Sequence, residues 1–192
     1  MTRNIRKFPC LTRPRKFADD RRGVAAVEFA IILPFMLSLY IGGVELCDGL
    51  AMNIKVTNTT HVVADLVTQN TCVTSGASGT LKTMLQASSA TIAPYSATPL
   101  TVTVSEVSTD ASGNATVTWS QSLNGTARIV GQPVTLPTSM IGQKNISLIL
   151  GEVTYGYTPN LGYAITGTVN LHDSYYLFPR NSNSITYAST CP

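Results

Sequence analysis

The sequence is poor in the residues from which active sites are built. Charged residues make up 12% of its 192 residues, and there are two histidines, His61 and His172. A lone histidine is more often a surface or packed residue than a catalytic group. The glycines form neither a phosphate-binding loop nor a dinucleotide fingerprint, and no Gly-x-Ser-x-Gly motif is present. We therefore assign no catalytic or cofactor-binding residue and expect a chain that is not an enzyme.

The four cysteines lie too far apart for a zinc site. Successive cysteines are separated by 37, 25 and 119 positions, whereas zinc-binding cysteines come in closely spaced pairs. No metal ligand or cofactor is therefore predicted. The four residues are Cys10, Cys47, Cys72 and Cys191.

Net positive charge is confined to the start of the chain. Residues 1–23 hold eight Lys and Arg against two Asp, a net charge of +6, whereas residues 24–192 hold five against eight, a net charge of −3. No basic face remains beyond this leader, which argues against nucleic acid as a partner. A basic segment that precedes an apolar one is typical of a leader held on the cytoplasmic side of a membrane.

Residues 24–44 form a long apolar run in which Glu28 is the single charge. As a helix rising about 1.5 Å per residue, the run would cover roughly 31 Å, the thickness of a bilayer's hydrocarbon core. The sequence therefore predicts one membrane span. An ordinary signal peptide, cut near Gly49 and Ala51, is the alternative, although this apolar region exceeds the usual ~7–15 residues. A lipoprotein is disfavoured because Val44-Glu45-Leu46, and not small residues, directly precede Cys47.

Glu28 is costly where it lies. A carboxylate costs roughly 2–3 kcal/mol or more at the bilayer centre and less near an interface, so Glu28 should have a partner. The alternative is that its side chain reaches the headgroups by itself. Pro34 removes one backbone donor inside the span, so a kink or local loosening is expected there.

A short motif surrounds Glu28. It consists of Gly23, Ala26-Val27-Glu28-Phe29, Pro34 and Gly43-Val44-Glu45. This motif resembles the N-terminal signature of the TadE-like family, the minor pseudopilins of the Tad (Flp, type IVc) pilus apparatus. The resemblance is specific over about residues 21–48 and only architectural beyond them.

The resemblance implies both a processing site and an assembly site. A prepilin peptidase would cut between Gly23 and Val24, where glycine offers no side chain to exclude. Glu28, followed by Phe29, would then neutralise the Val24 ammonium of a neighbouring subunit. The implied partners are the peptidase, other pilin or pseudopilin subunits, the assembly platform and the membrane. The implied location is the bacterial inner membrane, with a cytoplasmic N-terminus, a periplasmic head and incorporation into an extracellular pilus as a further option.

The helical pattern continues beyond the span as an amphipathic stalk that ends near Thr68. Its apolar side chains recur at spacings of four and three, which indicates a stripe that packs on the chain's own β-rich head. Packing between subunits is the alternative for this stripe. The stripe comprises Met52, Val56, Thr59, Val63, Leu66 and Val67.

The remaining chain predicts a short helix followed by strands. Residues 80–93 show helical spacing, and from Leu100 the period changes to two, with a hairpin turning at 110–114. Residues 146–157 predict a long strand, and 164–171 a further extended segment. A single helical turn within 136–142 is also possible. About four antiparallel strands against the long helix form the simplest two-layer arrangement.

The predicted fold is therefore α+β and pilin-like, with a long N-terminal transmembrane and amphipathic helix packed on a small antiparallel sheet. Its expected divisions are a cleaved cytoplasmic leader (1–23), the transmembrane and stalk helix (24–70) and an extracytoplasmic head (71–192).

The two cysteines of the expected head, Cys72 and Cys191, should pair in an oxidising compartment. The bridge would enclose 120 residues, for which the chain-entropy model gives roughly 4–5 kcal/mol. Two unrelated free thiols are the alternative.

The functional prediction is a minor pseudopilin that helps to assemble, prime or decorate a Tad-type pilus. A membrane-anchored or secreted binding domain, unrelated to a pilus, is the rival. The C-terminal third is rich in tyrosine, which sheet packing mostly explains, with an adhesive surface as the alternative.

Overall fold

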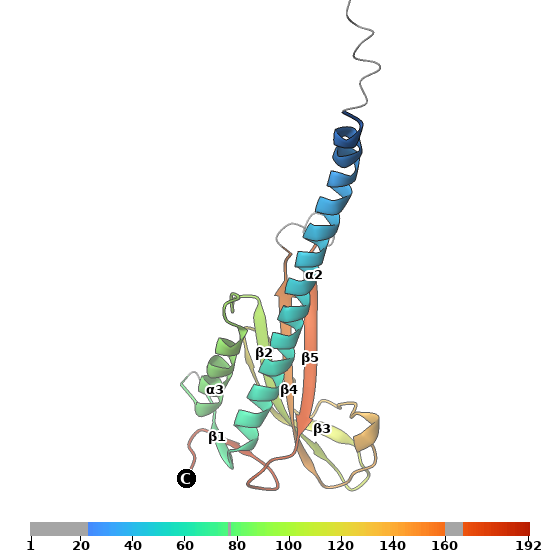
Figure 1. Cartoon of the computed structure of the whole chain (residues 1–192). Helices are drawn as coiled ribbons and strands as arrows, with labels where there is room; N and C mark the ends of the chain where they lie inside the picture. The colour runs from blue at the N-terminus through green and yellow to red at the C-terminus, as the bar shows by residue number, and fades with distance from the viewer. Residues whose placement is uncertain (1–22, 77, 160–166) are drawn as a thin grey trace, which may run out of the picture. The chain divides into compact units, whose positions relative to one another are not determined.

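The computed structural model describes residues 23–76, 78–159 and 167–192 (Figure 1). Its longest element is helix α2 (Val24–Thr68). Its ends agree with the predicted ones, and Pro34 lies inside the helix without ending it. The chain divides between Gly43 and Val44 into two compact units, so the first 20 residues of α2 belong to one unit and the rest to the other.

The described part of the first unit is an apolar helical segment. Within the described part of the chain, α2 is the single helix long and apolar enough to cross a membrane. Its large apolar side chains are exposed, among them Phe35 at 71% and Leu39 at 80%. Such an outward-facing apolar surface suits lipid or other helices and is unfavourable in water.

The second unit contains a four-stranded antiparallel sheet with the order β3-β2-β4-β5. Its strands are β2 (Leu100–Thr109), β3 (Ala115–Leu123), β4 (Ser147–Tyr157) and β5 (Val169–Leu177). The predicted α+β class, hairpin and long strand are confirmed.

The last strand of the sheet, β5, extends beyond the predicted segment 164–171. Residues 164–166 lie outside the described residues, and the strand continues to Leu177 through His172 and Asp173. Polar residues are tolerated there because β5 is an edge strand with little burial. They obscured the alternation on which the prediction relied.

The shorter helices also follow the sequence pattern. Helix α3 (Thr80–Ser89) continues into the 3-10 turn η2 (Ala90–Ile92), which ends before Pro94. The single helical turn predicted within 136–142 is η3 (Thr138–Met140).

The main core lies between the helices and one face of the sheet. Met52, Val56 and Val63 of α2 are fully buried in it, together with Leu81 and Leu85 of α3. The sheet contributes buried apolar residues from three strands to the same cluster: Leu100, Val102, Val104, Trp119, Ile149, Val153 and Tyr155. The stalk stripe therefore packs on the chain's own head, as predicted.

One position of the predicted stripe is displaced. Leu66 is only half-buried, whereas Thr60 and Ala64 are fully buried. The Thr60 hydroxyl donates to the carbonyl of Val56, so its polar group is satisfied inside the helix. Small side chains on this face allow α2 to approach the sheet closely.

The closest approach is at Gly151 of β4. A Cβ built on Gly151 would lie 3.2 Å from the Ala64 Cβ, 3.2 Å from the Thr60 carbonyl oxygen and 3.4 Å from the Val63 Cγ1. Two of these three neighbours are rigid parts of the helix. Glycine therefore sets the spacing between α2 and the sheet.

Replacing Gly151 by Ala should destabilise the head by about 1–2 kcal/mol, because the added methyl group has to push the helix away. Gly156→Ala, on the same strand, is the matched control: its Cβ would meet neighbours at 3.5 Å or more. That variant should be neutral or slightly stabilising, because alanine reduces the entropy of the unfolded chain. Thermal unfolding of the two variants checks the difference, and equal melting temperatures would contradict it.

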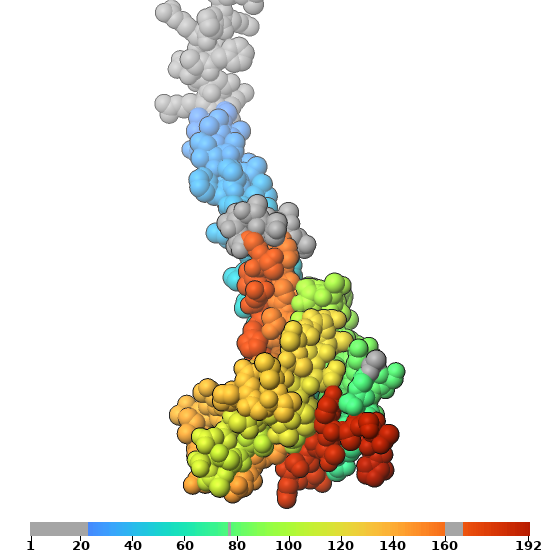
Figure 2. All heavy atoms as spheres, turned by 180° about the vertical axis from the view of Figure 1, so that it is seen from behind, coloured from blue at the N-terminus to red at the C-terminus, as the bar shows by residue number. Residues whose placement is uncertain are grey.

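The opposite face of the sheet carries a second, smaller core. Val107, Leu148 and Leu150 are buried there under Leu136 and its neighbours in the connection between β3 and β4. Figure 2 shows this side of the head, with the connection in yellow to orange. The remainder of the face is polar.

Candidate assembly segment and the head that carries it

The expected processing site lies at the start of α2. Gly23 precedes the helix and Val24 is its first residue. A Cβ at Gly23 would meet nothing within 4 Å. A chain cut between Gly23 and Val24 would therefore begin at the first residue of α2.

Glu28 and Phe29 lie on the second turn of α2, and both are exposed. Residues four apart share a helix face, so Glu28 lies about one turn beyond Val24 on the same side. The ion pairs found in the described part of the chain, Arg128–Glu152 and Arg180–Asp65, do not include it. The Glu28 carboxylate is thus presented outward at the positive end of the helix dipole.

The structure joins Cys72 and Cys191 by a disulfide, with their Cα atoms 5.8 Å apart. Cys47 is an exposed free cysteine. The bridge connects the segment just after α2 to the C-terminal end of the chain. Beside it, β1 (Cys72–Thr74) and β6 (Thr186–Ala188) pair as a small parallel sheet that the sequence pattern did not predict.

The C-terminal segment, residues 180–191, also caps the end of α2. The Arg180 backbone N–H donates to the Thr68 carbonyl at 2.9 Å, and the Asn181 side chain donates to the Gln69 carbonyl at 2.7 Å. The Arg180 guanidinium pairs with Asp65. These contacts satisfy carbonyls that a helix leaves unpaired at its C-terminus.

Ile185 fastens the C-terminal segment to the sheet. Its buried side chain enters the main core, and its backbone N–H donates to the Glu106 carboxylate at 2.9 Å. The Trp119 indole N–H donates to the Ile185 carbonyl at 2.9 Å, and the Trp119 ring stacks on Tyr187. The sequence pattern did not predict this clamp on Ile185; the alternation of Ile185 and Tyr187 near a cysteine was the available signal.

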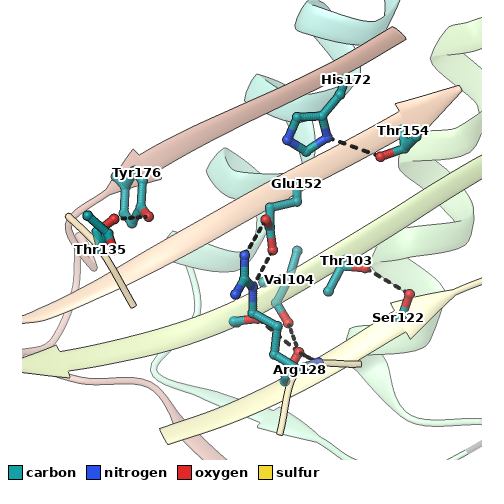
Figure 3. Close-up of polar contacts among 11 residues, drawn as sticks. Thr103, Val104, Ser122, Arg128, Thr135, Glu152, Thr154, His172 and Tyr176 are labelled. Atoms are coloured by element: carbon teal, nitrogen blue, oxygen red, sulfur yellow. Dashed lines mark hydrogen bonds and ion pairs between the residues drawn. The ribbon is translucent and has the colours of Figure 1, made fainter. Parts of the chain in front are cut away.

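The polar face of the sheet is joined by hydroxyl contacts and one ion pair (Figure 3). Both Nε and Nη2 of Arg128 donate to the Glu152 carboxylate, each at 2.6 Å. This hydrogen bond raises the pKa of Arg128. Thr103 bonds Ser122 across β2 and β3 at 2.8 Å. The Arg128–Glu152 pair therefore holds the connection after β3 against the sheet.

Each of the two histidines contacts a side chain of the sheet. His61 is exposed on α2 and its ring lies 3.9 Å from that of Tyr175. His172 contacts the Thr154 hydroxyl at 3.0 Å (Figure 3). Over the described residues, no group of three or more His, Cys, Asp or Glu is placed to hold a metal ion.

An apolar N-terminal helix whose second half packs on an antiparallel sheet is the design of a pilin-like α+β protein. The model of the TadE-like family, described as TadE-like protein, matches residues 23–65 of this chain. The predicted resemblance is confirmed, and it associates the chain with the structural components of Tad pilus systems. The match starts at Gly23, includes Glu28 and ends at Asp65, before the sheet begins. Neither the curated proteins nor the solved structures yielded a match.

Proposed function

We propose that this chain is a minor pseudopilin of a Tad-type (type IVc) pilus and acts structurally. The observation that carries the proposal is the placement of Gly23 directly before α2 and of Glu28 on its second turn, within the matched segment. The apolar part of α2 stores the subunit in the inner membrane, with the head in the periplasm. The head then primes, caps or decorates the filament.

Maturation exposes a new amine. A prepilin peptidase cuts the bond between Gly23 and Val24, and the amine released on Val24 becomes an ammonium at the start of α2. Glu28 of an adjacent subunit accepts that positive charge, which fixes the two helices in register. Pairing removes most of the cost of a carboxylate in lipid.

Cleavage is tested by replacing Gly23. N-terminal sequencing of the membrane form should give Val24 for the wild type and the intact Met1 end for Gly23→Leu, because the leucine side chain obstructs the peptidase. Gly42→Leu is the matched control: a Cβ there also meets nothing within 4 Å. It should still start at Val24. A wild-type chain that keeps Met1, or that starts near Met52, contradicts the proposal.

A membrane-anchored binding domain is the second candidate. It is favoured by two adjacent apolar side chains, Ile129 and Val130, which are 74% and 66% exposed on the connection after β3. Exposed apolar pairs of this kind suit a protein partner. The two candidates predict different fates for the leader, residues 1–23. An anchored binding domain keeps the leader in cells with and without the prepilin peptidase. A pseudopilin keeps it only in cells that lack the enzyme.

A further inference from the structure

One end of the head has almost no charge. Strand β2 starts at Leu100, which pairs with Tyr155, and β4 ends at Tyr157, which pairs with Val169 at the start of β5. These strand ends therefore meet at one edge of the sheet. The described residues that include these ends, 83–105, 153–159 and 167–171, contain no Lys, Arg, Asp, Glu or His.

Apart from Glu45, Asp48 and Lys55 of α2, the charged side chains of the head lie elsewhere. Asp110 lies in the turn between β2 and β3, and Lys144 precedes β4, so both belong to the opposite end of the sheet. The Arg180–Asp65 pair lies near the C-terminal end of α2. The charge distribution therefore distinguishes the two ends of the head.

Helix α2 enters the head at the uncharged end. A Cβ on Gly49 would lie 3.6 Å from the Tyr157 ring. Gly49 is five residues after Val44, the last residue of the apolar run, which is about 7.5 Å along the helix. That rise is close to the thickness of one headgroup layer, because a bilayer of roughly 40–45 Å has a hydrocarbon core of about 30 Å.

The side chains at this end match a lipid interface. Leu46, Leu50 and Val169 are 65%, 56% and 41% exposed. Tyr95 and Tyr157 are partly buried and pack against the main core. Tyrosine is enriched at headgroup level, where its ring is apolar and its hydroxyl group meets water.

The charged groups near this end lie on α2. The Lys55 ammonium donates hydrogen bonds to the carbonyls of Thr91 and Ala93. Glu45 and Asp48 lie near Tyr157; burial first, and then these two carboxylates, raises its pKa, so the phenol stays neutral. Acidic side chains do not attract anionic lipid, so the contact has to be apolar and aromatic.

We propose that this end of the head, formed by residues 93–99, Tyr157 and the exposed Leu46 and Leu50, is a docking surface for the phospholipid interface of the membrane that α2 spans. The proposal rests on the proposed function, which stores the subunit in a membrane. It places the head directly on the bilayer instead of on a free stalk. Extraction into a filament must then lift Tyr95 and Tyr157 out of the headgroup layer.

The test uses the full chain in phosphatidylcholine nanodiscs, labelled with 3-fluorotyrosine, with and without a lipid whose headgroup carries chelated Gd³⁺. The fluorine signals of Tyr95 and Tyr157, assigned by their absence in Tyr95→Phe and Tyr157→Phe, should be lost when the Gd³⁺ lipid is present. Tyr187, which is bonded to Gln121 through its hydroxyl, should keep its signal. The signal of Tyr40, which lies inside the apolar run, should also be lost if α2 is inserted in the bilayer.

A charge introduced into the proposed docking surface tests whether the head contacts the lipid or only lies near it. Ala97 is exposed in the uncharged loop, and Ala97→Glu should partly restore the Tyr95 and Tyr157 signals, because a carboxylate in that loop adds a desolvation cost to contact with lipid. Asn183→Glu is the matched control, because Asn183 is exposed near the start of β4 at the opposite end. With that variant the two signals should stay lost.

Each remaining outcome overturns the proposal in a distinguishable way. If the Tyr40 signal is lost but those of Tyr95 and Tyr157 persist, the helix is inserted and the head stands off the membrane, which leaves the proposed function intact. If Ala97→Glu does not restore the signals, the contact is not with this surface. If the Tyr40 signal persists, the helix is not inserted, and the membrane storage on which the proposed function depends fails as well.

Discussion

Replacing Glu28 by Gln is expected to reduce incorporation into the filament by roughly tenfold or more while leaving membrane insertion and cleavage unchanged. The apolar run is otherwise uncharged, so insertion does not require the carboxylate. Assembly should require it, because the proposed pairing of Glu28 with a neighbour's Val24 ammonium would be a charge-assisted hydrogen bond, worth about 1.5–3 kcal/mol. Its loss should weaken docking by roughly tenfold or more. The measurement is the amount of the subunit in sheared filaments relative to membranes.

Asp48→Asn is the matched control for Glu28→Gln. It removes the same charge from the same helix, but at a position beyond the apolar run. Its incorporation should equal that of the wild type. If Glu28→Gln incorporates equally well, Glu28 does not set the register, and the carboxylate is satisfied within its own subunit, by the helix N-terminus or by lipid headgroups.

The elements that could be predicted from the sequence are those specified by local periodicity. The end of α2 at Thr68 follows from the stripe beginning at Met52, and the β2–β3 hairpin follows from alternation on both sides of the turn at 110–114. The prediction that Leu66 belongs to the buried stripe was wrong, because helical spacing does not show that Gly151 lets Thr60 and Ala64 pack closely on the sheet. That contact joins residues far apart in the sequence.

The C-terminal segment could not be predicted for the same reason. Strands β1 and β6 have three residues each, too few to show a period, and they pair across more than 100 residues. The clamp on Ile185 depends on Glu106 and Trp119, which belong to two different strands. Only the cysteines indicated from the sequence alone that the end of the chain returns to the end of α2.

The processing and assembly residues could be proposed from the sequence because their spacing is local. Gly23 and Glu28 are five residues apart, and their meaning depends on the apolar run around them, not on a distant partner in the same chain. The group that would pair with Glu28 belongs to another subunit. That group, the proposed Val24 ammonium, therefore comes near Glu28 only when two subunits pack together.

The double variant Cys72→Ser, Cys191→Ser should unfold far more easily than the wild type. The bridge spans a sequence separation of 119, and a loop of that size contributes about 4–5 kcal/mol in the chain-entropy model. At about 2–4 °C per kcal/mol for a chain of this size, the melting temperature should fall by roughly 10 °C or more. Thermal unfolding of the full chain in detergent micelles measures the change.

Cys47→Ser is the matched control, because Cys47 is an exposed free thiol on α2. It should melt with the wild type in oxidising buffer, and both should fall to the melting temperature of the double variant when a reductant is added. The hydrogen bonds of Ile185 to Glu106 and Trp119 do not depend on the bridge, so the reduced head should still fold. A double variant that melts with the wild type would mean that these contacts and the capping of α2 by Arg180 hold the C-terminal segment in place without the disulfide.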